Sequence, residues 1–380
     1  MITDLFFELL QVSLGTRDKL SRVPSDALWG ELFEESFRQA ITGVMFSGIE
    51  GLPKEQKPTI DLLLEWIGET QIIEETTKMH RQRARELTER FLSAGFRSCV
   101  LKGVGSGLLY PHPMRRQCGD IDIWVDGRRK DVMAWLRTQC EIGHREWHHV
   151  EAKLFEDVDV EVHFYPIWLY NPFYNRRLQR WFRERKEDQM KERDHERDHE
   201  SDESIESSEL GFGYPTAEFN VVYSLVHTFH HLMDEGVGLR HVIDYFYIIR
   251  KFHTSSELCR VATEEDKSQI VSELQRFGLT SFLGAMMYVM KEACGMASEY
   301  LLCKPDEKAG KFLLDEIMLA GNFGHYDARI VRPEDESFLH RNIRKFRRQL
   351  RFLKYYPAEV LCAPLWKTWH WCWRLMHKDI

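Results

Sequence analysis

The chain has 380 residues, of which 43% are hydrophobic and 29% charged, a balance typical of a globular protein with a sizeable core. Its net charge of -8 argues against a protein whose whole surface binds nucleic acid, although it leaves room for a local basic patch. No apolar run reaches the roughly 18 residues of a membrane span, and eight scattered cysteines without a C-x-x-C pair favour reduced thiols in a cytoplasmic protein.

Residues 1–95 are predicted to form a helical N-terminal region, which begins with an amphipathic helix rather than a signal peptide. From Thr59 to Ala94, apolar residues recur at three- and four-residue spacing and no proline interrupts them. Gly95 is the expected end of this helix.

Short strands are predicted next. Residues 98–103 are an apolar run that ends in glycine, and residues 120–127 alternate with the period of two that marks a half-buried strand. A helix is expected over 128–140, and a hairpin with arms at 146–155 and 157–165 follows it.

Residues 183–210 are a charge run that we interpret as a solvated helix end or a flexible insertion. His195 and His199 lie four residues apart in it, but a solvated charged segment explains them better than a metal site. From 211 to 380 the amphipathic helical pattern returns. The predicted fold class is therefore α+β, with a small mixed sheet over 96–182 between helical N-terminal and C-terminal regions.

Two carboxylates suggest where the chemistry lies. In a strand, Asp120 and Asp122 point to the same face, where they repel each other unless a cation lies between them. Residues 157–163 offer a third acid by the same alternation. We favour Glu161 and place Asp159 second. Oxygen ligands of this kind suit Mg²⁺ or Mn²⁺, and two such ions can assist phosphoryl transfer.

The stretch LKGVGSGLLYPHPMRRQCGDIDIWV (101–125) resembles the signature of the uncharacterised nucleotidyltransferase family, within the DNA polymerase β-like superfamily. The residues that carry the resemblance are Lys102, Gly103, Tyr110, Pro111, Arg116, Asp120 and Asp122. It continues through VEVHFYP (160–166) and through HTFHHLMDEGVGLRHVIDYFYIIR (227–250).

The resemblance implies that a nucleoside monophosphate passes from an NTP to an acceptor hydroxyl, and that Asp120, Asp122 and Glu161 hold the metals. It also implies a helical C-terminal domain that closes the nucleotide cleft. The residues implied to bind the nucleotide are Lys102, Gly103, Gly105, Ser106, Arg116, Arg240 and Asp244. Two alternatives stay open: Lys102 pairs with an acid, and Arg116 pairs with Asp120 or Asp122.

Two other classes of function compete. A non-catalytic scaffold is suggested by Val104, which stands where the superfamily often has a second small residue. A metal-dependent hydrolase would need His227, His231 and Asp244 to converge, although hydrogen bonds among them are the simpler expectation.

The acceptor is open: a small molecule or a macromolecule such as tRNA or a protein side chain fits equally. The basic segment 340–356 is a candidate contact for RNA or anionic lipid, or for the acidic insertion of the chain itself. The last residues, 365–380, hold four tryptophans, and we expect them to dock on the protein body.

Overall fold

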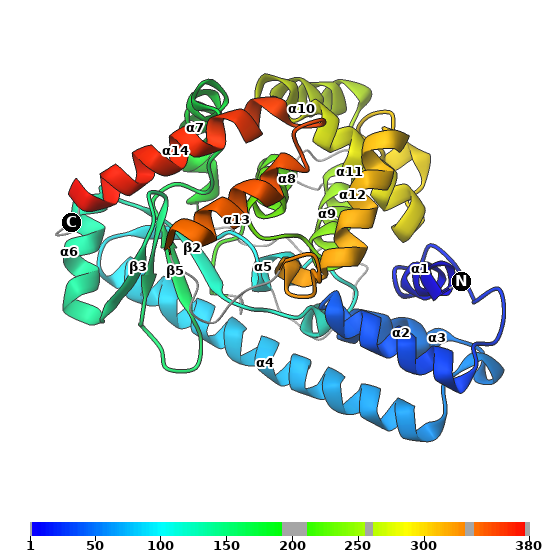
Figure 1. Cartoon of the computed structure of the whole chain (residues 1–380). Coiled ribbons are helices and arrows are strands. Elements are labelled where there is room, and N and C mark those ends of the chain that lie inside the picture. The colour runs from blue at the N-terminus through cyan, green and yellow to red at the C-terminus, as the bar shows by residue number, and fades with distance from the viewer. Residues whose placement is uncertain (1, 192–210, 255–260, 331–337, 377–380) are drawn as a thin grey trace.

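The computed structural model describes residues 2–191, 211–254, 261–330 and 338–376. Its centre is a mixed sheet in the order β1-β2-β5-β4-β3, surrounded by helices (Figure 1). The strands are β1 (Arg97–Val100), β2 (Ile121–Asp126), β3 (Ile142–Arg145), β4 (His149–Ala152) and β5 (Val160–His163). Strands β2 and β5 are parallel, and the other neighbours are antiparallel. The predicted α+β class is confirmed.

The hairpin prediction needs a correction. Strands β4 and β5 do pair as antiparallel neighbours, but they are shorter than the expected arms at 146–155 and 157–165. The chain between them loops outward, and Asp157 in this loop pairs with Arg83. The edge strand β3 was not predicted, because Gly143 and its polar neighbours lack a clear alternation.

The two faces of the sheet are buried differently. Ile121, Ile123 and Val125 of β2 pack in a cluster with α4 (Ile60–Ser93) and α6 (Arg129–Gln139). Trp124 points to the opposite face and stacks on Phe219. The alternation of β2 therefore directs Asp122 away from the cluster that contains α4, as the period of two predicts.

The long helix α4 confirms the prediction for residues 59–94, and Gly95 follows it with a φ of +83°, a conformation that glycine adopts readily. The helices before it are α1 (Ile2–Ser13), α2 (Asp26–Arg38) and α3 (Thr42–Gly51). They share one apolar cluster with the C-terminal helices. Thr16, just after α1, donates a 2.7 Å hydrogen bond to the Cys294 carbonyl oxygen.

Helices dominate the rest of the chain. They are α7 (Pro172–Gln189), α8 (Ala217–Asp234), α9 (Leu239–His253), α10 (Glu264–Arg276), α11 (Thr280–Cys294), α12 (Glu307–Ala320), α13 (Phe338–Leu350) and α14 (Pro357–Met376). Residues 183–189 of the charge run form the end of α7, whereas His195 and His199 lie outside the described residues. Short helical turns are α5 (Val104–Gly107), η1 (Lys54–Gln56), η2 (Pro113–Arg115), η5 (Ser298–Tyr300) and η6 (Asn322–Gly324).

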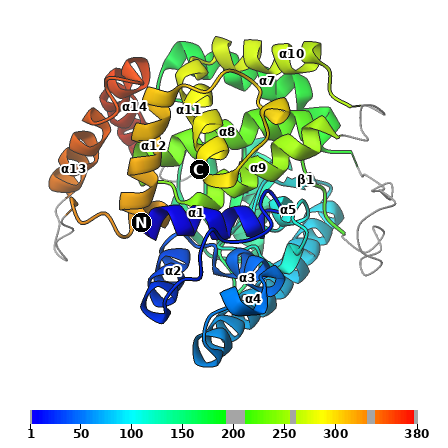
Figure 2. The same ribbon diagram turned by 90° about the vertical axis from the view of Figure 1, so that its right-hand side faces the viewer.

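Helices α13 and α14 lie together on one side of the molecule, away from α4 (Figures 1 and 2). The Trp366 ring of α14 stacks on Trp168, with the ring centroids 4.2 Å apart, so this part of the tryptophan-rich segment packs on the protein body. Leu361 and Leu365 of the same helix remain exposed. Within the part of the chain that the structure describes, no helix has the length and apolar character needed to cross a membrane.

Candidate active site

Carboxylates from two neighbouring strands meet at the face of the sheet opposite α4. In the parallel pairing of β2 and β5, Asp122 lies directly opposite Glu161. One ligand atom each of Asp122, Glu161 and His163 lies within 4.8 Å of the others. Asp120, immediately before β2, is partly exposed, Asp159 is exposed, and neither belongs to this group. The geometry therefore brings Glu161, rather than Asp159, to the aspartate pair.

Two cationic side chains balance these acids. The Lys102 Nζ atom lies 3.0 Å from Asp122 Oδ2 and 3.8 Å from Asp120 Oδ2. Burial disfavours the ammonium charge, but Asp120, Asp122 and Glu161 together outweigh burial and raise the pKa of Lys102. Lys102 thus pairs with Asp120 and Asp122 in this structure and neutralises part of their charge, which is the alternative that the sequence left open.

His163 is the second cation. Its Nε2 atom lies 2.9 Å from Asp122 Oδ1 and 3.4 Å from Glu161 Oε2. Burial opposes the imidazolium, yet hydrogen bonds to the two carboxylates raise the pKa of His163 to about 9. Burial likewise disfavours the ionised form of Glu161, but the His163 hydrogen bond and the charge of His149 lower its pKa to about 2.

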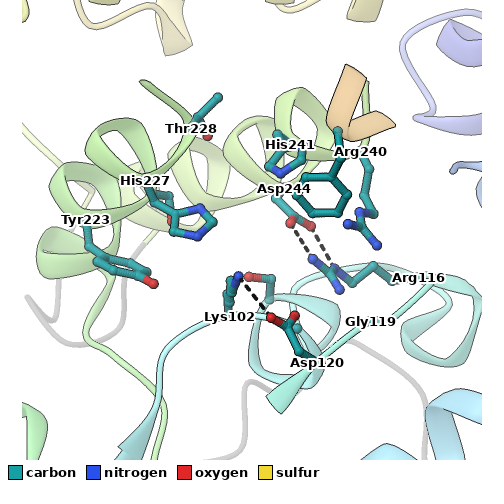
Figure 3. A pocket seen from close by; sticks show the side chains of 14 residues that line it. Lys102, Arg116, Gly119, Asp120, Tyr223, His227, Thr228, Arg240, His241 and Asp244 are labelled. Atoms are coloured by element: carbon teal, nitrogen blue, oxygen red, sulfur yellow. Dashed lines mark hydrogen bonds and ion pairs between the residues drawn. The ribbon is translucent and has the colours of Figure 1, made fainter. Parts of the chain in front are cut away.

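A cavity opens between Asp120 with Lys102 and the helices α8 and α9, and Asp122, Glu161 and His163 do not line it (Figure 3). Lys102, Gly119 and Asp120 lie on its sheet side. The opposite wall consists of Tyr223, His227 and Thr228 from α8 and of Arg240, His241 and Asp244 from α9. The cavity leaves about 30 Å³ for the centres of water molecules, which is room for about two waters.

Three buried polar atoms without partners belong to residues that line this cavity. The Nε–H group of Arg240, Nδ1 of His241 and the hydroxyl of Tyr223 find no hydrogen-bond partner among the described residues. Arg240 forms no ion pair with those residues either, and burial lowers its pKa. Because unpaired buried polar groups are costly, a polar ligand in the cavity would stabilise these three groups.

Comparison with known proteins identifies the family. A model of the uncharacterised nucleotidyltransferase family matches residues 25–295, which is most of the chain. The chain belongs to this family. No curated protein and no solved structure matches it. The resemblance found in residues 101–125 is thereby confirmed, and the carboxylates and every cavity-lining residue except Phe323 lie inside the matched region.

In this nucleotidyltransferase, Arg116 has a partner that the sequence did not suggest. Its guanidinium binds Asp244 through two contacts, Nε to Oδ1 at 3.0 Å and Nη2 to Oδ2 at 2.6 Å. The Tyr110 hydroxyl donates to the same carboxylate at 2.6 Å. The alternative pairing of Arg116 with Asp120 or Asp122 is thus not present in this structure, and phosphate binding by Arg116 stays a prediction. Arg116 and Asp244 satisfy each other, and Arg240 is the arginine of the cavity without a carboxylate.

The histidines of α8 do not form the metal site that a hydrolase would need. The Nε2 atoms of His227 and His231 lie 3.1 Å apart and hydrogen-bond to each other. Asp244 is engaged by Arg116 and Tyr110, and the metal-competent clusters among the described residues include none of these three groups. Burial lowers the pKa of His227 well below its ordinary value, so it is a neutral ligand-facing side chain.

The glycine turn after β1 has its own geometry. Gly103 has a φ of +64°, and a side chain on Gly105 would collide with the Tyr214 ring. The Gly105 N–H donates to the Lys102 carbonyl oxygen at 3.1 Å, and the Ser106 hydroxyl is hydrogen-bonded to Tyr214. These two groups are thus occupied within the turn, and a phosphate-binding role for Gly103, Gly105 and Ser106 stays a prediction.

Three buried histidines support Glu161 from the side. His148, His149 and His163 also bring one nitrogen each within 4.8 Å of the others. The Trp168 indole donates a hydrogen bond to His148 Nδ1 at 3.1 Å, so the proton of the neutral His148 ring is on Nε2. The Nε2–H group of His148 then donates to His149 Nδ1, with the two nitrogens 2.9 Å apart. A proton on His148 Nε2 disfavours metal binding there, so this group is best described as a satisfied hydrogen-bond network.

Phe323 is a cavity residue that the sequence did not reveal. It lies in η6 with φ 52° and ψ 23°, a left-handed conformation that is strained for a bulky residue. Its ring contacts His231 and His241 and lies 5.3 Å from the Arg240 guanidinium carbon. The flanking Gly321 and Gly324 were the available signal for a tight turn, but nothing in their spacing placed that turn at the cavity.

Proposed function

We propose that this chain transfers a nucleoside monophosphate from an NTP to an acceptor hydroxyl and releases pyrophosphate. One observation carries the proposal: Asp120, next to the paired Asp122 and Glu161, lies across a cavity from Arg240, whose buried guanidinium has no carboxylate partner among the described residues. Negative charge on one side suits cations, and positive charge on the other suits phosphate oxygens.

Asp120, Asp122 and Glu161 would hold Mg²⁺ or Mn²⁺. Their oxygen donors are the type that these ions prefer, and Asp122 and Glu161 already lie within 4.8 Å. When bound, the metals would supply charge neutralisation for the phosphates of the NTP. Lys102 and His163 now balance the same carboxylates. Metal binding therefore competes with these two cations.

The residues of the chain have separate roles in this proposal. Arg240 binds phosphate oxygens from the helical side, and Lys102 does so from the sheet side. Glu161, which is ionised at neutral pH because its pKa is about 2, accepts a hydrogen bond from the acceptor hydroxyl and takes its proton. The acceptor oxygen then forms a bond to the α-phosphorus, the bond to the bridging oxygen breaks, and pyrophosphate leaves.

We also propose that the protein acts in the cytoplasm. The cysteines among the described residues, such as Cys99 and Cys118, are free thiols, as a reducing compartment favours.

A non-catalytic nucleotide-binding protein is the second candidate. Internal neutralisation of the acids by Lys102 and His163 favours it, as does a cavity too small for a nucleotide in this state. Binding without turnover would distinguish it from the transferase.

The test measures NTP binding and pyrophosphate release with Mg²⁺ or Mn²⁺ for the wild type, Asp122→Asn and the control Asp159→Asn. We expect Asp122→Asn to lower turnover by about a hundredfold or more, while Asp159→Asn, an exposed acid two residues from Glu161, remains near wild type. Turnover that survives Asp122→Asn would refute the site assignment. NTP binding without turnover in the wild type would favour the second candidate.

A further inference from the structure

A second hollow lies far along the sheet from the acids, between the edge strand β3 and the end of α14. Figure 1 shows the red end of α14 beside β3 and α6. Gly143, His144 and Arg145 line one side, and Trp371, Trp373 and Arg374 line the other. The volume of this hollow is about 390 Å³, whereas the volume of the candidate active-site cavity, measured in the same way, is about 30 Å³. The two have no lining residue in common. The larger volume is within the range of small-molecule sites.

The walls of this hollow are fixed by polar contacts beneath them. Glu146 accepts hydrogen bonds from His144 at 2.8 Å and lies 3.1 Å from His370 of α14. The Arg129 guanidinium lies 4.8 Å from the Trp373 ring centre and donates to the Trp147 carbonyl oxygen at 2.7 Å. Because these contacts join α14 to the sheet, the hollow belongs to the folded structure rather than to a loose chain end.

Trp371 differs from the other tryptophans of α14. Trp366, Trp369 and Trp373 each contact another aromatic ring. Trp371 is 46% exposed, and its indole has no ring contact and no hydrogen bond within the described part of the chain. An exposed indole at the rim of a cavity is a platform on which a planar group can stack.

The charges around Trp371 favour an anion. Arg145 and Arg374 line the hollow beside the indole. Two acids beside β3 are already engaged: Glu146 by histidines, and Glu151 by the backbone N–H of His144 at 3.1 Å. Guanidinium groups bind phosphate with defined geometry and also stack on planar rings.

From this combination we propose that the β3–α14 hollow binds a nucleotide unit, with its base stacked on Trp371 and its phosphate held by Arg374. The unit belongs either to a free nucleotide or to a single-stranded RNA. This site is separate from the proposed transfer chemistry, and it does not depend on that proposal.

The sequence suggested residues 340–356, which include the basic helix α13, as a contact for RNA or anionic lipid, but the structure favours this role less than the sequence does. Arg348 is buried and donates to the Leu232 carbonyl oxygen, and Arg351 pairs with Glu316 and Asp327. These side chains hold α13 on the protein, so they are not available to a ligand.

The test measures binding of three probes: a fluorescein-labelled single-stranded oligouridylate, AMP, and vesicles of phosphatidylserine and phosphatidylcholine. Trp371→Leu removes the platform, and Trp369→Leu is its matched control, because Trp369 lies on the same helix with 43% exposure but outside the hollow. We expect Trp371→Leu to weaken binding at least about fivefold and Trp369→Leu to change it less than twofold. Arg374→Gln should also flatten the salt dependence.

Binding of both AMP and the oligonucleotide would support a nucleotide site, and binding of the oligonucleotide alone would assign it to RNA. Binding of vesicles alone would overturn the proposal, as would equal affinities of the Trp371→Leu and wild-type proteins. Asp122→Asn should bind the probes as the wild type does, so failure of the transferase proposal leaves this test unaffected.

Discussion

Among the arginines of the cavity, Arg240 is the one without an ion-pair partner among the described residues. We predict that Arg240→Met weakens NTP binding by about tenfold or more, because the phosphates lose a charged donor. The same change should alter thermal stability little, since the loss of the 3.0 Å hydrogen bond from Nη1 to the Gln117 carbonyl oxygen is offset by the removal of a buried guanidinium without an ion-pair partner. Binding titrations and thermal melts measure the two effects. A large loss of stability would instead show that Arg240 has a structural role.

Asp244, unlike Arg240, is a charged residue of the cavity that has an ion-pair partner, Arg116. Asp244→Asn leaves the Arg116 charge buried beside a neutral amide and removes an acceptor from Tyr110. We expect a loss of about 3–5 kcal/mol in the free energy of unfolding, measured by urea denaturation. The double change Arg116→Met with Asp244→Met should recover much of this loss. If the double variant loses as much as the two single variants together, the pair is not coupled.

At the scale of single elements, the turn η6 contributes one wall of the cavity through Phe323, whereas the other walls come from the sheet side and from α8 and α9. The backbone of this turn packs closely on the α8–α9 connection, where a Cβ on Gly238 would come within 2.9 Å of the Asn322 Cα. Phe323 holds a strained backbone conformation in it. Relief of this strain would move the turn and enlarge the cavity, which now leaves about 30 Å³ for the centres of water molecules.

We therefore predict that Phe323→Ala raises the association rate of a fluorescent NTP analogue several-fold, because the ring no longer fills the entrance. Stopped-flow mixing measures this rate. Phe312→Ala is the control: Phe312 stacks on Tyr355 and does not line the cavity. An unchanged association rate in Phe323→Ala would mean that the nucleotide enters elsewhere.

Local patterns predicted the elements that have a clear period. The alternation around Asp122 and Glu161 specified two strands, and the parallel pairing then placed both acids on one face. The spacing of apolar residues likewise defined α4. These features follow from a few neighbouring residues, so they can be recognised without the fold.

Contacts between distant segments could not be predicted in this way. Arg116 is 128 residues from Asp244, and no local pattern links them. Helix α7 was missed because the charge run hides its apolar face, although Asn171 followed by Pro172 is a usable start signal. The end of α14 and β3 meet across more than half of the chain, so the hollow between them was not visible in the sequence.

At the scale of the whole molecule, α14 closes the fold by returning to the centre of the chain. Glu359, in its first turn, accepts hydrogen bonds from the backbone N–H groups of Tyr170 at 2.7 Å and Asn171 at 3.2 Å. The carboxyl group is buried, and Lys367 of the same helix pairs with Asp234 at the end of α8. These contacts attach the C-terminal helix both to the segment after the sheet and to the helix that lines the cavity.

The buried Glu359 makes global stability depend on pH. Burial raises its pKa from 4.5 to about 7, against the two hydrogen bonds, which lower it. Between these two values the folded chain keeps a proton that the unfolded chain has lost, so unfolding releases a proton and stability falls as pH rises. The shift corresponds to about 3 kcal/mol. This contribution is fully present below about pH 4.5 and lost above about pH 7.

We predict that Glu359→Gln removes this part of the pH dependence, because the amide has no proton to lose. The measurement compares the urea midpoints of the two proteins at about pH 5 and about pH 8, with Glu307→Gln as a control on an exposed acid. Relative to the wild type, the free energy of unfolding of Glu359→Gln should therefore increase as pH rises. A constant difference between the two proteins would mean that Glu359 is already ionised in the folded state, and that the two backbone N–H groups stabilise its charge despite burial.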